Sequence, residues 1–564
     1  MRLPPLALAA TSAAAAVAGA ARVEVWWDVG SVRVNRAGHG ARTGVGVNGT
    51  LPVAPVYATQ GDTLVLHVRN RLAESTSVHA HGILQAGTPF MDGPAMVTQC
   101  GIPPNGSFTY EYRLDRAGTF WLHGHDHHQN SDGLRTPLVV YDRPGEAPIA
   151  YDSEYLLSFE DWYHSEFSKR IAETLDPALP FPPPASFPYL LVNGVDANRT
   201  QTLRFEPGCT YRIRLVNMAT TEWVRFAMPG HEMRVIEADG VYSRPHTATA
   251  LSLGPGQRYS VLVTAHGSAQ FNFRYHMSLY ASFVPQVAGM SPRRYTGMIE
   301  YARGAPTADV RDAAAVDAAE AAGDLDRLPL GKDSDVALRA LAAQPPLPVD
   351  RTVQAVLGGA TIADGSTRDV INGMTYAAPR VPTLYSALSL GPLAANSTLY
   401  GPQTNTVVLG HNQGVEVVIH NPNRLPHPMH LHGHTFQIIE YGPVDPSLLP
   451  AGADPPPGLG VQRYRGHPMR RDTVVVPAFQ YVRVRFRASN PGAWLLHCHM
   501  DIHFAMGMAM TFVTAPDVLQ RTIAVPDAML QLCAAQGIPL EGNAAGNLGL
   551  SLDGLPPVPV LSPA

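Results

Sequence analysis

An all-β fold with about three domains is predicted by the length and composition of the chain. At 564 residues the chain is too long for a single hydrophobic core. Charged residues make up only 15% of it, while 50 Gly and 51 Pro indicate many turns between strands. Residues 117–125 (AGTFWLHGH) and 491–499 (PGAWLLHCH) echo each other. This internal similarity predicts duplicated domains of one fold.

The motif that organises the last of these domains is HCHMDIH at residues 497–503, followed by Met508. The alternating sequence before it, with Val, Phe and Trp, predicts β-strands that lead into the motif. Side chains on a strand alternate between its faces. The two histidines that flank Cys498 should therefore point one way and the thiol the other. Two His, one Cys and an axial Met form a blue-copper centre, and Cys498, His503 and Met508 supply three of these groups.

Four His-x-His pairs are spread along the chain. HPMHLH at residues 427–432 provides the missing imidazole for the blue-copper centre, His427, and one of these pairs. Each pair presents both rings on one strand face, so all eight imidazoles could converge on a group of three metal ions: His79, His81, His123, His125, His430, His432, His497 and His499. Structural zinc is the weaker alternative, because zinc sites favour Cys-x-x-Cys pairs and the sequence contains none.

On these motifs the sequence resembles the multicopper oxidase superfamily of laccases, ascorbate oxidases and fungal ferroxidases, over residues 23–516. The resemblance implies an all-β fold of three consecutive cupredoxin-like Greek-key β-barrel domains. It implies four copper ions: one type 1, one type 2 and a type 3 pair. It places His427, Cys498, His503 and Met508 on the type 1 copper, His79 and His430 on the type 2 copper, and His81, His123, His125, His432, His497 and His499 on the type 3 pair.

The resemblance also implies what these coppers do. The type 1 copper takes single electrons from a donor, and the other three pass four electrons to O2, which becomes water. Met508 as axial ligand, in place of an apolar residue, should favour Cu(II) and give a low-to-middle reduction potential.

Three carboxylates are candidate catalytic residues. Asp501 and Asp92 match acidic positions of the family and would supply protons near the copper cluster. Asp92 lies in a Met-Asp-Gly turn and is equally typical of a turn-capping residue. Asp161, in FEDWYH at residues 159–164, resembles an acid that binds Fe(II) in ferroxidases. In a laccase it would accept a proton from a phenol, and its structural alternative is an ordinary acid at a strand end.

We expect the following order of domains along the chain. Residues 1–20, with Arg2, an apolar run and a small-residue end, are typical of a secretory signal peptide. Cupredoxin-like domains should occupy residues 21–145, 150–302 and 348–516, the last with the type 1 copper. Residues 303–347 indicate a linker with short helices near 310–322 and 334–343. The tail at 517–564 has a candidate helix at 528–536.

The remaining features predict a secreted, monomeric glycoprotein. The resemblance implies a disulfide between Cys100 and Cys533, which suits an oxidising compartment, and leaves Cys209 free and buried. Sequons occur at Asn48, Asn105, Asn198 and Asn396 and support a secreted route to the extracellular space or cell wall. The net charge of −5 offers no basic surface for nucleic acid, and no membrane anchor is expected.

The sequence favours a laccase-like enzyme, which oxidises phenolic or related aromatic donors, over a ferroxidase. Fe(II) prefers carboxylate oxygens, but residues 277–293 and 386–401, which resemble the regions that bind iron in ferroxidases, contain no acid. Asn396 stands at one such position. Ferroxidase activity is the alternative function, and a non-catalytic copper-binding or storage protein is an alternative of another class. Storage, however, has no need of a cysteine between two histidines.

Overall fold

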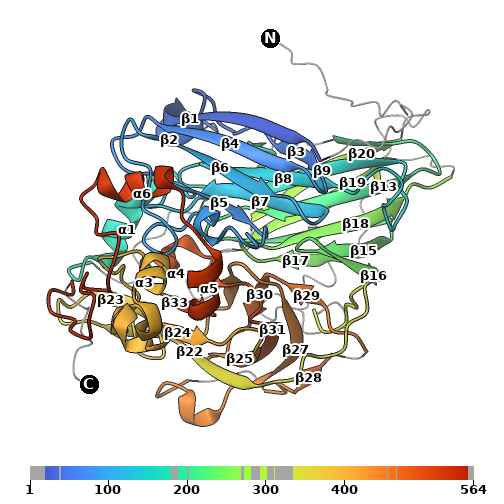
Figure 1. Cartoon of the computed structure of the whole chain (residues 1–564). Coiled ribbons are helices and arrows are strands. Elements are labelled where there is room, and N and C mark those ends of the chain that lie inside the picture. The colour runs from blue at the N-terminus through green and yellow to red at the C-terminus, as the bar shows by residue number, and fades with distance from the viewer. Residues whose placement is uncertain are drawn as a thin grey trace.

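The computed structural model describes residues 20–556, except 37, 39, 180–187, 198, 200, 201, 268–271, 281–292, 302–309, 312–334, 454, 456 and 465. In these residues the strands form six sheets, which fall into three pairs along the chain (Figure 1). The predicted all-β class is confirmed. The proposed signal peptide lies almost wholly outside the described residues.

The first pair consists of two four-stranded sheets. One has the order β2-β1-β4-β6: β1 (Arg22–Val34), β2 (Arg42–Val47), β4 (Thr63–Asn70) and β6 (Ser107–Arg113). The other has the order β3-β8-β7-β5: β3 (Val56–Thr59), β5 (Val78–His81), β7 (Gly118–Gly124) and β8 (Arg135–Tyr141). Side chains of β6 alternate between exposed and buried, as expected of a strand with one face in solvent. All of β7 is buried, and its Trp121 packs against Val216 and Met218 of the second pair.

The second pair has seven and six strands. The larger sheet has the order β11-β10-β9-β13-β18-β15-β16: β9 (Ser153–Trp162), β10 (Tyr189–Val192), β11 (Val195–Asp196), β13 (Thr210–Asn217), β15 (Met233–Ala238), β16 (Val241–Ala248) and β18 (Arg258–Thr264). The smaller has the order β12-β20-β19-β14-β17, with β21 beside β19: β12 (Thr202–Phe205), β14 (Trp223–Ala227), β17 (Leu251–Leu253), β19 (Asn272–Tyr280), β20 (Arg293–Tyr301) and β21 (Val310–Arg311).

The third pair has seven and five strands. The larger sheet has the order β23-β22-β25-β31-β27-β28, with β29 beside β27: β22 (Arg351–Thr361), β23 (Thr367–Ile371), β25 (Gly414–Asn421), β27 (Phe436–Pro443), β28 (Gln462–Arg463), β29 (Arg470–Arg471) and β31 (Gln480–Arg487). The smaller has the order β24-β33-β32-β26-β30: β24 (Val407–Leu409), β26 (His427–Leu431), β30 (Thr473–Val476), β32 (Gly492–Cys498) and β33 (Ala509–Thr514).

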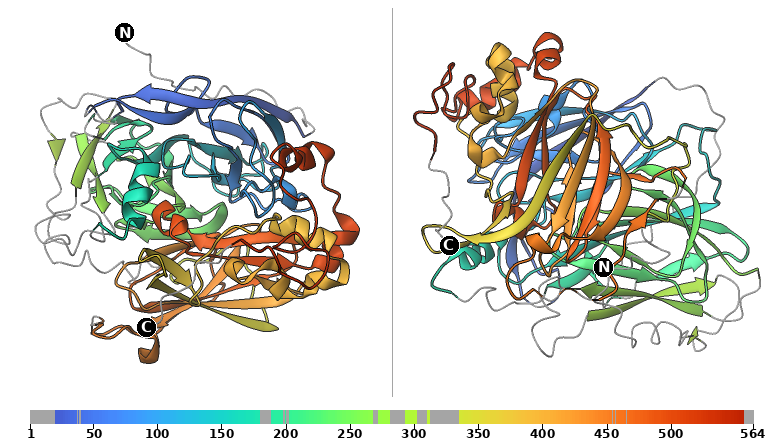
Figure 2. Two further views of the ribbon diagram at one scale, coloured as in Figure 1. Left: turned by 90° about the vertical axis from the view of Figure 1, so that its left-hand side faces the viewer. Right: turned by 90° about the horizontal axis from the view of Figure 1, so that it is seen from below.

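All three pairs share one topological feature. The first strand of each runs parallel to a later strand of the same sheet: β1 to β4, β9 to β13, and β22 to β25. Parallel partners need a crossover connection, so this shared pairing supports repetition of one fold. The two orthogonal views show the three units packed around a common centre (Figure 2).

The helices are short and lie between or outside the sheets. They are α1 (Phe167–Leu175), α3 (Thr383–Ser389), α4 (Asp501–Ala505), α5 (Pro516–Thr522) and α6 (Asp527–Ala534), with 3-10 turns η1 (Pro89–Met91), η3 (Gly391–Ala395), η4 (Ser397–Tyr400), η5 (Pro402–Thr404) and η6 (Pro446–Leu448). Helix α6 confirms the one expected in the tail. Leu519, Met529 and Leu532 join the core of the first sheet pair, so the tail crosses the molecule to reach it (Figure 1).

The predicted disulfide is confirmed: Cys100 is bonded to Cys533. Cys209 is a free thiol, but it is only partly buried, against the core of the second pair.

The helix expected at residues 334–343 is wrong. Residues 335–337 form a turn, and the bridges from Ala340 to Ser243 and from Arg339 to Pro468 are extended. Val336, Leu338 and Ala340 are buried while their neighbours are not, a period of two that is typical of extended chain. The helix expected at 310–322 falls outside the described residues, apart from the strand β21.

Candidate metal centres

The four His-x-His pairs lie on strands that pair with each other, or at the ends of these strands: His125, His432 and His499 directly follow β7, β26 and β32. In the first sheet pair, β5 runs antiparallel to β7 with His79 opposite His123. In the third, β26 runs antiparallel to β32 with His430 opposite His497. Each two-stranded unit therefore presents four imidazoles, and the two units face each other across the interface between the first and third sheet pairs.

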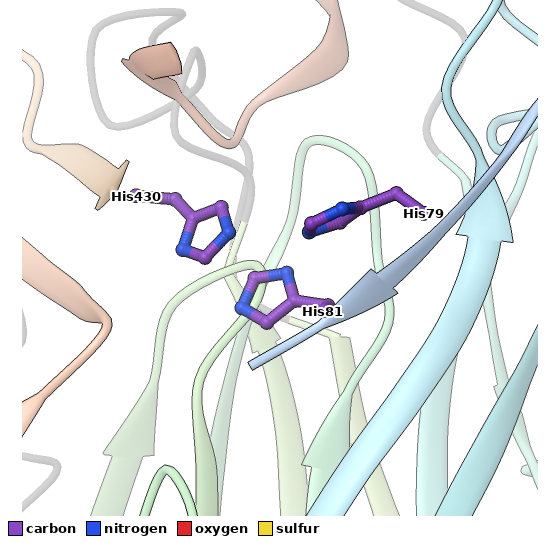
Figure 3. Close-up of side chains that lie close together, drawn as sticks. All are labelled: His79, His81 and His430. Atoms are coloured by element: carbon purple, nitrogen blue, oxygen red, sulfur yellow. The ribbon is translucent and has the colours of Figure 1, made fainter. Parts of the chain in front are cut away.

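The eight imidazoles form three groups in which the candidate ligand atoms lie within 4.8 Å of one another: His79, His81 and His430; His81, His123 and His499; and His125, His432 and His497. The first group joins β5 to β26 (Figure 3), and the ring centroids of His81 and His430 are 3.7 Å apart. His81 belongs to two groups. The predicted convergence of all four pairs is therefore what the fold produces.

Hydrogen bonds fix which ring nitrogen faces the centre of each group. The Nδ1 atoms of His79, His123 and His430 lie 2.7, 3.0 and 2.9 Å from the carbonyl oxygens of Asp92, Gly124 and Asp472. An Nδ1–H that donates to a carbonyl leaves the lone pair on Nε2. Within the described residues the Nε2 atoms of these three histidines are buried without a partner. Buried acceptors without a partner are costly, and a metal ion would satisfy them.

His81 is oriented in the opposite sense. Its Nε2 lies 3.1 Å from Asp472 Oδ1 and 3.2 Å from Thr473 Oγ1, so its Nδ1 faces the cluster, 3.2 Å from His499 Nε2. The Nε2 atoms of His432 and His497 are also 3.2 Å apart. Two imidazole nitrogens that bind one ion at about 2 Å lie roughly 3 to 3.5 Å apart. These distances fit shared metal ions.

Burial favours the neutral form of seven of these eight imidazoles. It lowers the pKa of His125 and of His499 to about 3, and neighbouring imidazoles lower both pKa values further. The pKa values of His81, His123, His430, His432 and His497 also fall well below the usual value for the same two reasons. A neutral imidazole has a free lone pair, which is the form that binds a metal ion.

A separate group lies on the other side of β32. Cys498 Sγ is 3.7 Å from His427 Nδ1 and 3.4 Å from His503 Nδ1, and the two Nδ1 atoms are 3.1 Å apart. All three side chains are buried, as is that of Met508. Burial raises the pKa of the Cys498 thiol, so a metal ion that binds here must displace its proton. The predicted alternation of faces along β32 therefore produces a Cys-His-His group.

Two of the predicted acids lie beside these groups. The carboxylate of Asp92 is fully buried, with Oδ2 2.8 Å from His432 Nδ1 and Oδ1 3.3 Å from His79 Nδ1. Asp92 thus bridges two groups of histidines and does more than cap a turn. Asp501 is the first residue of α4 and accepts hydrogen bonds from Ser131 Oγ (2.5 Å) and Asn130 Nδ2. Burial raises the pKa of Asp501 to about 7, although these two donors oppose the shift.

Asp161 is placed differently from its prediction. Its side chain is 1% exposed and accepts hydrogen bonds from the backbone N–H groups of Thr220 (2.9 Å) and Thr221 (2.8 Å), with Arg135 3.5 Å away. A carboxylate enclosed in this way has no oxygen free for an Fe(II) ion or a phenol. The Thr220 carbonyl in turn accepts from the Asp501 amide (2.7 Å), so Asp161 anchors the turn that holds the start of α4.

Two residues that support the histidine groups, Asp472 and Arg258, were not predicted from the sequence. Asp472 contacts two cluster histidines, His81 through its carboxylate and His430 through its carbonyl. The two terminal guanidinium nitrogens of Arg258, on β18, donate to this carboxylate at 2.7 Å. The second sheet pair therefore also supports the cluster. The only signal in the sequence is a charged run (residues 470–472) before a strand, which is too common to predict this role.

Comparison with known proteins matches three parts of the chain. Residues 28–145, 153–295 and 376–518 each match a domain described as multicopper oxidase. "Iron transport multicopper oxidase fetC" of Epichloe festucae is 35% identical over 98% of this chain and 86% of its own length. "Iron multicopper oxidase fer1" of Mycosarcoma maydis is 34% identical over 98% of this chain and 90% of its own length.

Solved structures agree with the fold. Fet3p, a multicopper oxidase that functions in iron import, has a TM-score of 0.84 and 28% identity, covering 96% of this chain and 100% of that one. A laccase from Botrytis aclada has a TM-score of 0.71 and 27% identity, covering 92% and 93%. The three predicted cupredoxin-like domains are confirmed by these likenesses. In the part of the chain that the structure describes, no helix has the length and apolar character of a membrane span.

Proposed function

Because the chain belongs to the multicopper oxidase family, we propose that it couples the oxidation of a one-electron donor beside Cys498 to the reduction of O2 among the eight paired histidines. The family and the histidine groups support four copper ions: one type 1, one type 2 and a type 3 pair. When bound, the type 1 copper would accept single electrons, and the other three would deliver four electrons to O2.

The proposed ligands follow the groups in the structure. His427, Cys498, His503 and Met508 would hold the type 1 copper. His79 and His430 would hold the type 2 copper, while His81, His123 and His499 would hold one copper of the type 3 pair and His125, His432 and His497 the other. The buried Nε2 atoms that have no partner among the described residues support this assignment.

One observation carries the coupling of the two sites. Cys498 contributes its thiol to one group, while His497 and His499, its two neighbours in sequence, contribute to the two histidine groups on the opposite side. Two covalent routes of a few bonds therefore join the donor side to the oxygen side. A storage protein has no use for such a link, and the donor would approach the histidines of the Cys498 group from outside.

Protons must reach the oxygen side together with the electrons. Asp92, between His79 and His432, is positioned to hold a proton beside the cluster. Asp501, with its pKa raised to about 7, can carry a proton near neutral pH and give it up. We assign both as proton donors, and Asp161 as a structural anchor.

We propose Fe(II) as the donor, which reverses the preference that the sequence suggested. The support comes from relatives that are 31 to 35% identical over 92 to 98% of this chain and are named as iron or iron transport multicopper oxidases. The proposed signal peptide supports export, with O2 reduced outside the cell.

A phenolic or related aromatic donor is the second candidate, and one observation favours it. Residues 386–401 contain no acid, and the side chain of Asn396 there serves its own turn by accepting from the Thr398 amide. Asp161 is enclosed as well. A hard dication is bound best by carboxylates, whereas an aromatic donor has no need of them.

The deciding experiment is steady-state O2 consumption by the copper-loaded protein with Fe(II), a methoxyphenol, a naphthalenediol and ascorbate, compared side by side. A kcat/KM for Fe(II) well above that for each aromatic donor is expected. The reverse order would establish the laccase-like function. No O2 uptake with any donor, in a sample that holds four coppers, would overturn the proposed enzyme and restore the storage alternative.

A further inference from the structure

The turn that presents Met508 is tied to a separate segment of the third domain, residues 369–376. The Met506 carbonyl accepts two hydrogen bonds from this segment, from the Asp369 amide (3.0 Å) and the Thr375 hydroxyl (3.0 Å). The Tyr376 amide donates to the Gly507 carbonyl at 2.9 Å. Three hydrogen bonds therefore hold the two residues directly before Met508.

The turn can approach the segment at residues 369–376 this closely because residue 507 is a glycine. Its φ is +110°, and a Cβ at this position would lie 1.9 Å from Thr375 Oγ1 and 3.0 Å from the Asp369 carbonyl oxygen. The turn therefore requires glycine both for its backbone conformation and for the space that Thr375 occupies. Thr375 is itself 2% exposed, so water cannot replace its hydroxyl without local rearrangement.

The other side of the turn is bonded to the Cys498 group. The Met508 amide donates to the His503 carbonyl (2.9 Å), and the Cys498 amide donates to the Met508 carbonyl (3.1 Å). The backbone of Met508 is thus fixed relative to two of the other proposed type 1 ligands. The segment at residues 369–376 closes the remaining side, so the turn is held from both directions.

We propose that Thr375, with Gly507, is a positioning residue that sets the distance of the Met508 thioether from the type 1 copper and so sets its reduction potential. This inference rests on the proposed ligand role of Met508. An axial thioether would form only a weak, long bond to copper. That bond is too weak to hold Met508 in place, so the surrounding backbone must position it. If the turn loosens, Met508 withdraws, Cu(I) is favoured and the potential rises.

The experiment compares Thr375→Val, which keeps the shape but removes the donor, with Thr375→Ser, which keeps the hydroxyl, and with Met508→Leu as reference. The potential of the type 1 copper is measured by redox titration of its visible absorption, and the EPR spectrum reports both type 1 and type 2 copper. Thr375→Val should have a potential between those of the native protein and Met508→Leu, with an altered type 1 EPR signal and an unchanged type 2 signal. Thr375→Ser should match the native protein.

The outcomes separate the two proposals. If Met508→Leu raises the potential but Thr375→Val does not, the positioning role is overturned and the ligand stands. If Met508→Leu changes neither the potential nor the type 1 EPR signal, Met508 is no ligand and both proposals fall. Should Thr375→Val not fold, Thr375→Ala removes the same hydroxyl without added bulk. It is also expected to raise the reduction potential of the type 1 copper.

Discussion

Strands β7 and β32 are built alike, each as a buried strand that leads into a His-x-His pair, and they differ in the residue between the two histidines. Both are buried along their whole length, both pair with a second His-x-His strand, and both deliver two imidazoles to the cluster. Between its two histidines, β7 has Gly124 and β32 has Cys498. The first unit therefore ends at the cluster, while the third continues through to the second candidate metal site, the Cys498 group.

The surroundings of Gly124 and Cys498 also differ. A Cβ on Gly124 would lie 3.1 Å from Gln129 Cβ and 3.1 Å from Leu134 Cδ2, so the first domain is closed behind its histidines. Behind Cys498 the third domain instead places His427 and His503. Of the two half-clusters in the described residues, only the one on β32 is backed by a further group of metal-binding side chains, where we propose that electrons enter.

The substitution with the largest expected effect is Cys498→Ser, because it removes the thiol that distinguishes β32 from β7. Removal of the thiolate should abolish the visible absorption of type 1 copper and lower donor-driven O2 uptake by about 1000-fold or more, a loss of about 4 kcal/mol at the transition state. Spectroscopy and O2 consumption measure both effects. The type 2 EPR signal, which depends on the other face of the strand, should persist. Retained turnover would mean that electrons bypass Cys498.

Cys533→Ser tests how the two half-clusters are held together. The Cys100–Cys533 bond closes a loop with a sequence separation of 433 residues, and loss of a native disulfide costs about 2 to 5 kcal/mol. The free energy of unfolding should fall by that amount in denaturant titrations, with loss of copper at lower denaturant. Cys209→Ser is the matched control, since Cys209 is free. An equal effect of both substitutions would contradict a specific role of the tail.

Gly124→Cys is the reciprocal substitution. Because the added Cβ meets close neighbours and no pair of imidazoles faces it, we expect a loss of about 1 to 3 kcal/mol in unfolding free energy and no second blue-copper absorption. Gly124→Ala adds the same Cβ without the thiol and should be destabilised to a similar degree. A new thiolate-to-copper band in Gly124→Cys would show that the first domain retains a latent site.

Asp369→Asn sharpens the comparison by adding a dependence on pH, because the segment at residues 369–376 of the third domain carries an acid whose Oδ2 is buried. Asp369 Oδ2 is buried without a partner in the described residues, and burial raises the pKa of Asp369 from 3.8 to about 8. Between these values the folded state binds more protons than the unfolded one, so the stability of the native protein falls as pH rises from about 4 to 8. The variant should lack this loss, and its advantage in thermal unfolding should be largest near pH 8 and vanish near pH 4. An advantage that does not depend on pH would exclude titration of Asp369 as its cause.

The corrections to the sequence predictions have a common origin. Asp161 resembles a catalytic acid in its local sequence, yet it is enclosed by Thr220 and Thr221, which lie some 60 residues away. The segment near 334–343 is rich in helix formers, yet Leu338 and Ala340 extend into the core of the second domain. In both cases packing against a distant part of the chain outweighed the local signal.

The sequence by itself determined the all-β class, the eight paired imidazoles and the opposite orientation of Cys498, because strand alternation and ligand chemistry are local properties. Only the tertiary structure decided how the imidazoles divide into groups, that His81 turns its Nδ1 inward, and that Asp472, Arg258 and Thr375 support the centres. The physical reason is that these contacts join strands from separate sheets, and their geometry depends on how the domains pack, which no local periodicity records.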